Sequence, residues 1–140
     1  MTRSRKDPSS KITRIVNKKT GGEKDSKLAR FDLIPPKPLT YLAEVYGYGC
    51  SGGKYLPRNW ERGYDWGLSF AAMQRHLWAD WGGERLDPES GLPHLAHAAW
   101  HCLTLMEWAE THPELDDRSS SGRGPKRTSR NTMAYPKVTP

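Results

Sequence analysis

Residues 69–112, SFAAMQRHLWADWGGERLDPESGLPHLAHAAWHCLTLMEWAETH, decide the fold of this chain. On both sides of the polar connection at 82–93, apolar residues recur at intervals of three and four, the spacing of helices that bury one face. The first helix is predicted to start at Asp65 or Ser69 and to end at Trp81, with Asp65 as its N-cap. The second is predicted to open at Ser90 or Pro93 and to end near His112.

Upstream of this stretch, the prolines of LIPPKP (33–38) favour a helix start, because proline suits a first helical turn but not a helix interior. We predict a helix from Pro38 to Tyr48. Glycines then follow at 47, 49, 52 and 53, and KYLPRNWERGYDW (54–66) is predicted to be a polar loop. No stretch alternates apolar and polar residues over the length of a strand, so the predicted class is all-α, a small helical bundle.

Charge is unevenly distributed along the 140 residues, although the chain as a whole carries +6. Residues 1–30 hold ten Lys and Arg against three Asp and Glu, residues 118–140 hold six against none, and residues 31–117 hold six against thirteen. We therefore predict a domain at 20–117 between flexible basic tails at 1–19 and 118–140, with the loop at 20–27 disordered or ordered by a ligand. An acidic domain that binds phosphates needs divalent cations.

Three helices form a small hydrophobic core. The six Trp side chains add more apolar surface than such a core is expected to bury. We expect a homo-oligomer, a dimer or a tetramer. The two cysteines, Cys50 and Cys102, form no CxxC pair, and no apolar run approaches the length of a membrane span. These features predict a cytoplasmic protein without a disulfide framework.

Two pairs of candidate metal ligands lie at helical spacing. His76 and Asp80 are four positions apart, and His94 and His97 are three apart, so each pair shares a helix face. A single helical His is more often a hydrogen-bonded structural residue, and Asp87 is equally well explained as a turn or N-cap residue. Convergence of both pairs with an acidic connection favours a metal site instead. The predicted ligands are Glu44, His76, Asp80, Asp87, His94 and His97.

Hydrolysis of a phosphoanhydride requires cations, an activated water and positive groups beside the phosphates. We predict His76, Asp80 and Glu84 as catalytic residues and Mg²⁺ or Mn²⁺ as the cofactor. Phosphate and base recognition is assigned to a further set, although Lys24 and Lys27 also fit a solvated basic face and Trp60 also fits core packing. The predicted substrate-binding residues are Lys24, Lys27, Lys54, Tyr55, Arg58, Asn59, Trp60 and Arg75.

Three blocks in order, TGGEKDSKLARFDLIPP (20–36), GGKYLPRNWERGYDW (52–66) and QRHLWADWGGERLDPESGLPHLAH (74–97), resemble the phage dATP/dGTP diphosphohydrolases of the MazZ-like group. The resemblance covers about residues 20–117. That group is similar to the MazG and HisE pyrophosphatases, which are oligomeric all-α bundles using Mg²⁺ or Mn²⁺. The resemblance implies that dGTP or dATP is cut to the monophosphate and pyrophosphate. In some members the dGMP supplies 2-aminoadenine synthesis for modified phage DNA, which implies the host cytoplasm.

The chain departs from the wider MazG signature of ExxE on one helix and ExxD on the next. His76 and Asp80 stand on one predicted helix, and His94 and His97 on the other. The missing carboxylates would then come from Glu44, Glu84, Asp87 or Glu89.

Two other functions remain open from the sequence. A nucleic-acid-binding or regulatory protein would use the basic tails to hold phosphates, with the bundle as a scaffold. The acidic middle disfavours this as the main function. A phosphohydrolase of another metal class, using zinc or iron, also fits the histidines.

Overall fold

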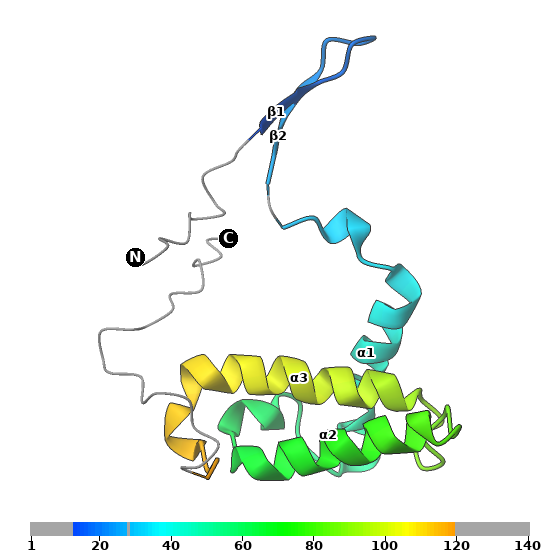
Figure 1. The fold of residues 1–140 in the computed structure, drawn as a ribbon, viewed down its shortest axis with the longest axis vertical. Coiled ribbons are helices and arrows are strands. Elements are labelled where there is room, and N and C mark those ends of the chain that lie inside the picture. Colours follow the sequence, from blue (N-terminus) through cyan, green and yellow to red (C-terminus); the bar gives the residue numbers. More distant parts are fainter. Residues whose placement is uncertain (1–12, 28, 120–140) are drawn as a thin grey trace, which may run out of the picture. The chain divides into compact units, whose positions relative to one another are not determined.

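The computed structural model describes residues 13–27 and 29–119 (Figure 1). These residues belong to two units, divided between Ile34 and Pro35, and each unit is described by itself. Predictions about residues 1–12 and 120–140, which make up most of both basic tails, lie outside the described residues.

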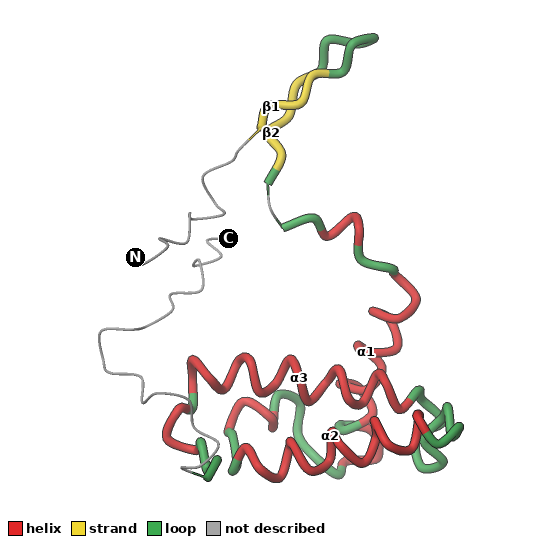
Figure 2. Tube along the Cα trace, in the orientation of Figure 1, coloured by secondary structure: helices red, strands yellow, loops and turns green. Residues whose placement is uncertain are grey.

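The first unit contains a hairpin that the sequence did not reveal. Strands β1 (Thr13–Val16) and β2 (Glu23–Ser26) pair antiparallel, with Thr13 opposite Ser26 and Val16 opposite Glu23 (Figure 2). In the turn, the Asn17 side-chain oxygen accepts hydrogen bonds from the backbone N–H groups of Lys19 and Thr20. Part of the predicted tail therefore forms β1, and part of the predicted loop at 20–27 forms β2. Both faces of the four-residue strands are largely exposed, so no buried face imposes alternation on the sequence.

The second unit begins with α1 (Pro36–Tyr48), two residues earlier than predicted. Pro35 stands at the N-cap, and Pro36 and Pro38 both fit inside the first turn, where backbone N–H groups have no intrahelical partner. The predicted end at Tyr48 is confirmed. Short 3-10 turns occur at Phe31–Leu33 in the first unit and at Ser51–Gly53, Asn59–Arg62 and Pro113–Leu115 in the second.

Helices α2 (Trp66–Trp81) and α3 (His94–Thr111) lie side by side (Figures 1 and 2). Helix α3 begins directly after Pro93, which is one of the two predicted starts. It ends at Thr111, next to the predicted end near His112. Asp65 does stand before α2, but its side chain makes no capping hydrogen bond. The Asp117 carboxylate accepts one from the Gly67 backbone N–H at 2.8 Å instead. Asp65 thus holds the predicted N-cap position, whereas the hydrogen bond to the first turn comes from Asp117, fifty positions after Gly67.

Helix α3 supplies most of the core. It buries Ala96, Ala98, Thr104 and Trp108 together with two histidines, and it packs against both α2 and α1. The indole N–H of Trp108 donates to the Trp60 carbonyl at 3.0 Å. Apart from one isolated bridge between Leu86 and Pro93, the regular secondary structure described in this unit is helical, so the predicted all-α class is confirmed, with the hairpin as an addition to it.

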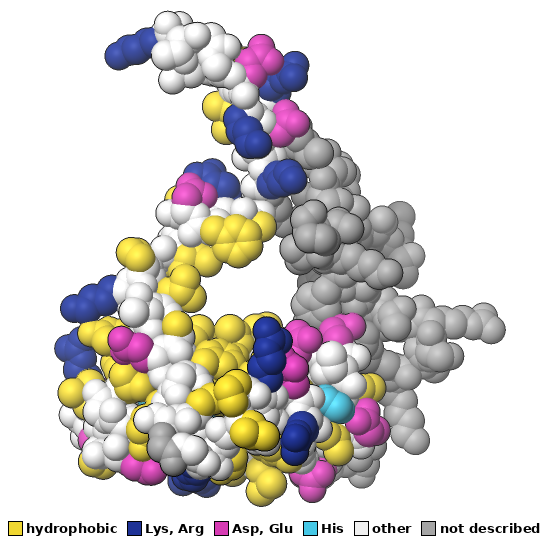
Figure 3. All heavy atoms as spheres, turned by 180° about the vertical axis from the view of Figure 1, so that it is seen from behind, with side chains coloured by type: hydrophobic (Ala, Val, Ile, Leu, Met, Phe, Trp, Pro, Cys, Tyr) yellow, Lys and Arg dark blue, Asp and Glu magenta, His cyan; other side chains and the backbone are white. Residues whose placement is uncertain are grey.

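Many large apolar side chains stay exposed on this small unit. Hydrophobic side chains stand between charged ones over the face shown in Figure 3. Trp81 is 84% exposed, and Trp78 and Phe70 on the same helix are also exposed. Cys50 and Cys102 are both free. Among the described helices, none combines the length and apolarity needed to cross a bilayer.

Candidate functional site

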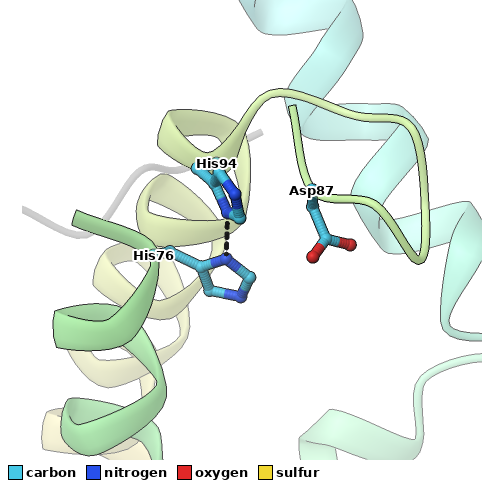
Figure 4. Close-up of side chains that lie close together, drawn as sticks. All are labelled: His76, Asp87 and His94. Carbon is cyan, nitrogen blue, oxygen red and sulfur yellow. Dashed lines mark hydrogen bonds between the residues drawn. The ribbon is translucent and has the colours of Figure 1, made fainter. Parts of the chain in front are cut away.

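Two histidines and one aspartate meet where α2, its connection to α3 and the start of α3 come together (Figure 4). His76 comes from α2, His94 is the first residue of α3, and Asp87 lies on the connection. One ligand atom from each lies within 4.8 Å of the others. The Nδ1 atoms of His76 and His94 are 2.9 Å apart and share a hydrogen bond. The connection, rather than a second position on α2, therefore supplies the carboxylate.

Asp87 is fixed by a turn within the connection. Its Oδ2 accepts hydrogen bonds from the backbone N–H of Ser90 at 2.9 Å and from the Ser90 hydroxyl at 2.8 Å. Burial raises the pKa of Asp87, but the two Ser90 hydrogen bonds and nearby imidazoles outweigh burial, and the pKa is lowered. The carboxylate is therefore an anion at neutral pH. These hydrogen bonds confirm the predicted turn role of Asp87, and its role as a metal ligand stays a prediction.

His97 is not one of these three residues, but it contacts them. Its Nε2 is 2.7 Å from the Ser90 hydroxyl oxygen and 3.7 Å from Asp87 Oδ2. Since Ser90 already donates its proton to Asp87, His97 Nε2–H donates to Ser90. Its ring also stacks on that of His76, with centroids 4.6 Å apart and planes 9° apart. His97 thus supports both Asp87 and His76.

His101 belongs to the same cluster, and the sequence analysis missed it. Its Nδ1 is 2.7 Å from the hydroxyl of Ser69, which is fully buried on α2. Burial, followed by repulsion from His76 and His97, lowers the pKa of His101 to about 4, so the ring is neutral at neutral pH. The signal was present, because His94, His97 and His101 follow the i, i+3, i+7 spacing of one helix face.

The donor set fits a divalent metal ion. Two imidazoles and one ionised carboxylate are ligands typical of such sites. His94 is 4% exposed, and its Nε2 is buried without a hydrogen-bond partner among the described residues. The nearest carboxylate oxygen, Oε2 of Glu84, is 3.6 Å from that nitrogen. A metal-binding histidine whose second nitrogen faces a carboxylate is a common arrangement.

A cavity of about 1070 Å³ lies beside this cluster in the second unit. His97 and His101 form part of its wall, and Tyr46, Trp60 and Trp100 provide aromatic surface. The rings of Trp60 and Trp100 approach the Tyr46 ring to 6.0 and 5.8 Å between centroids. The cavity also collects a group predicted from sequence to bind substrate, namely Lys54, Tyr55, Arg58, Asn59 and Trp60.

Arg58 stands at the rim in an unusual conformation. Its φ is 63°, and it is the sole non-glycine residue with positive φ in the described part of the chain. Left-handed backbone costs energy for a residue with a Cβ, and such residues cluster at functional sites. Its guanidinium forms a 2.7 Å ion pair with Glu61.

Within the second unit, other predicted site residues are not among the cluster or the cavity wall. Asp80 lies one turn after His76 and Glu44 lies exposed on α1, and neither is among the converging ligand atoms. Arg75 is exposed on α2 and does not line the cavity. Lys24 and Lys27 belong to the first unit, beside a separate cavity of about 420 Å³. The roles assigned to these five residues stay predictions.

Comparison with known proteins agrees with the resemblance seen in the sequence. A family model described as "dATP/dGTP diphosphohydrolase, N-terminal" matches residues 18–118. No curated protein and no solved structure matches the chain significantly. The matched segment includes every residue of the cluster and of the cavity wall described above. The chain therefore belongs to the dATP/dGTP diphosphohydrolase family.

Proposed function

We propose that this protein is a metal-dependent hydrolase that converts dGTP and dATP to the monophosphate and pyrophosphate. The observation that carries the proposal is the position of the cavity beside the cluster: a wall with aromatic and cationic groups adjoins two histidines and a carboxylate. A volume of about 1070 Å³ is ample for a nucleotide, since small-molecule sites span roughly 300–1,000 Å³.

The cavity residues divide into two chemical kinds. Aromatic rings of Tyr55 and Trp60, with the amide of Asn59, suit a purine that stacks and hydrogen-bonds. Lys54 and Arg58 suit phosphate oxygens. His97 and Glu89 on the wall lie toward the cluster, so we assign the triphosphate to that side.

The reaction consumes one water and breaks the bond between the α- and β-phosphates, giving dNMP and pyrophosphate. Mg²⁺ or Mn²⁺, when bound, would acidify a water and neutralise phosphate charge. We propose Asp87, His76 and His94 as ligands, with Glu84 beside His94. Asp80 keeps its predicted catalytic role, and Glu44 and His97 their predicted metal roles, as hypotheses for mutagenesis.

Broader proposals come from the sequence and the family. The domain spans 20–117, the protein is a homo-oligomer, and it acts in the host cytoplasm. The dGMP would feed 2-aminoadenine synthesis in a phage with modified DNA. Binding of nucleic acid through the basic ends is the alternative function.

The direct test is to incubate the full chain with dGTP or dATP, with Mn²⁺ or Mg²⁺, and to identify the products. We expect monophosphate and pyrophosphate in equal amounts and no reaction with chelator. Release of orthophosphate alone, or no turnover of any purine nucleotide, contradicts the proposal. DNA binding that weakens steeply with salt and survives chelator would instead favour the alternative.

A further inference from the structure

We propose that His76, His94 and Asp87 form a binding site for one divalent transition-metal ion, which selects Mn²⁺, Co²⁺ or Zn²⁺ over Mg²⁺ and joins α2 to α3 through their connection. The inference deepens the proposed function by specifying its metal. It does not need substrate, so it can fail or succeed independently of hydrolysis.

The spacing of the donor atoms already approaches that of a metal centre. Metal–nitrogen bonds of about 2.0–2.2 Å at octahedral or tetrahedral angles put two nitrogens roughly 2.8–3.6 Å apart. The Nδ1 atoms of His76 and His94 are 2.9 Å apart. Two neutral imidazoles at this separation share one proton, and an ion that binds both nitrogens replaces that proton.

The Glu84 carboxylate lies beside the second ring nitrogen of His94. Its Oε2 is 3.6 Å from the buried Nε2 of His94, which has no hydrogen-bond partner among the described residues. In the tautomer that carries its proton on Nε2, on the side of the Glu84 carboxylate, the Nδ1 lone pair faces His76. Glu84 is therefore a positioning residue that acts through His94.

Asp87 offers a free oxygen to the same place. Both hydrogen bonds from Ser90 go to Oδ2, and Oδ1 accepts none from the described residues. The Ser90 turn holds the carboxylate, and His97 in turn holds Ser90. Three chain segments, namely α2, the connection and α3, thus present two nitrogen atoms and one oxygen atom to one another (Figure 4).

The donor types decide the metal. Mg²⁺ takes oxygen ligands and keeps several waters, whereas imidazole nitrogen suits transition metals. A site with two nitrogens and one oxygen thus differs from the carboxylate centre that the ExxE and ExxD signature implies. Mg²⁺ remains able to accompany the triphosphate through phosphate oxygens.

The test titrates the metal-free full chain with Co²⁺ and follows the visible absorption of the bound ion. We expect one Co²⁺ per chain, displacement by Zn²⁺, and no displacement by a large excess of Mg²⁺. His76→Gln and Asp87→Asn should lose the absorption band, and Glu84→Gln should bind about 10–100-fold more weakly. Glu110→Gln, an exposed carboxylate on α3, is the matched control and should bind as the unaltered chain does.

Two further measurements guard against a folding defect. Circular dichroism establishes that each variant keeps its helices, and Co²⁺ should raise the melting temperature of the unaltered chain but not of Asp87→Asn. Pulsed electron paramagnetic resonance of Mn²⁺ bound to the unaltered chain should show coupling to imidazole nitrogen. The proposal is overturned if Mg²⁺ competes equally with Co²⁺, if nitrogen coupling is absent, or if the two ligand variants bind Co²⁺ normally.

Discussion

At the scale of single residues, burial rather than residue type sets the charge of this site. His76, His97 and His101 all have pKa values below that of a free imidazole, with burial as the largest cause in each. Asp87 meets the same burial penalty but keeps its charge, because Ser90 donates two hydrogen bonds to it. The result is that His76, His97 and His101 favour the neutral form beside an anionic carboxylate.

Stability should fall as the pH drops below about 6.5, because the unfolded chain then protonates at His101 while the folded chain, with a pKa of about 4, does not. The loss reaches at most about 1.4 kcal/mol per pH unit for one histidine. His76 and His97, which face His101, act in the same direction, and the raised pKa of exposed His112 acts in the opposite one. Urea unfolding in chelator near pH 7.5 and near pH 5 measures the effect. The free energy of unfolding of His101→Gln should change less between these two pH values than that of the unaltered chain. An equal change in both proteins would exclude His101 as the cause.

Arg58→Asn should raise the KM for dGTP about tenfold or more, the value of a charged hydrogen bond, with a smaller effect on kcat. Asn is chosen because it tolerates the left-handed backbone at this position. Arg62→Asn is the matched control, since Arg62 lies exposed in the same 3-10 turn but not on the cavity wall. Steady-state kinetics of both variants tests the phosphate role, and equal KM values would remove Arg58 from the substrate site.

At the scale of elements, helix periodicity and helix ends have different origins. The apolar spacing of α2 and α3 predicted both helices, and the two helices pack against each other. The hydrogen bond that caps the first turn of α2 depends on tertiary structure, because Asp117 accepts it from the Gly67 N–H although the two residues are fifty positions apart in the sequence. Asp65 has the right type and position for a cap and does not make the bond.

Asp117→Ala should therefore destabilise the protein by roughly 0.5–2 kcal/mol, the usual value of an N-cap hydrogen bond. Asp65→Ala should change the free energy of unfolding far less. Urea unfolding of the two variants under identical conditions compares them. A larger loss at Asp65 than at Asp117 would show that Asp65 caps the helix in solution.

At the scale of the whole molecule, the helical unit leaves an apolar surface on α2 and α3. Phe70, Leu77 and Trp81 repeat at helical spacing along α2, and Leu95, Leu103 and Met106 along α3, all of them exposed. Buried hydrophobic residues among the described ones are few and mostly small, namely Val45, Ala96, Ala98 and Trp108. In the predicted homo-oligomer, a second copy of the chain would bury these exposed side chains.

Trp81→Glu should shift the protein to a smaller species in light scattering coupled to size-exclusion chromatography, because a charge would be buried in the interface. Leu39→Glu, at an exposed apolar position on α1, is the control and should keep the assembly. A monomer in the unaltered protein at micromolar concentration would refute the oligomer prediction.

Local sequence pattern was enough to predict the helical class and the two main helices within a few residues, and it named the histidines and the aspartate that the structure brings together. Periodic burial along a helix is written locally, and so is the three- and four-residue spacing of its histidines. The family match at 18–118 agrees with the blocks that suggested it.

Only the tertiary structure decided which of these groups meet. The ligand atoms of His76 lie near those of His94 and Asp87 and not near that of Asp80, although Asp80 is only four positions away on the same helix. Ser69 and His101, far apart in sequence, form a buried pair. The β1–β2 hairpin also escaped sequence reasoning, because its register comes from backbone pairing and buries neither face. Such partners depend on how helices and loops pack, and packing joins residues whose separation along the chain carries no signal.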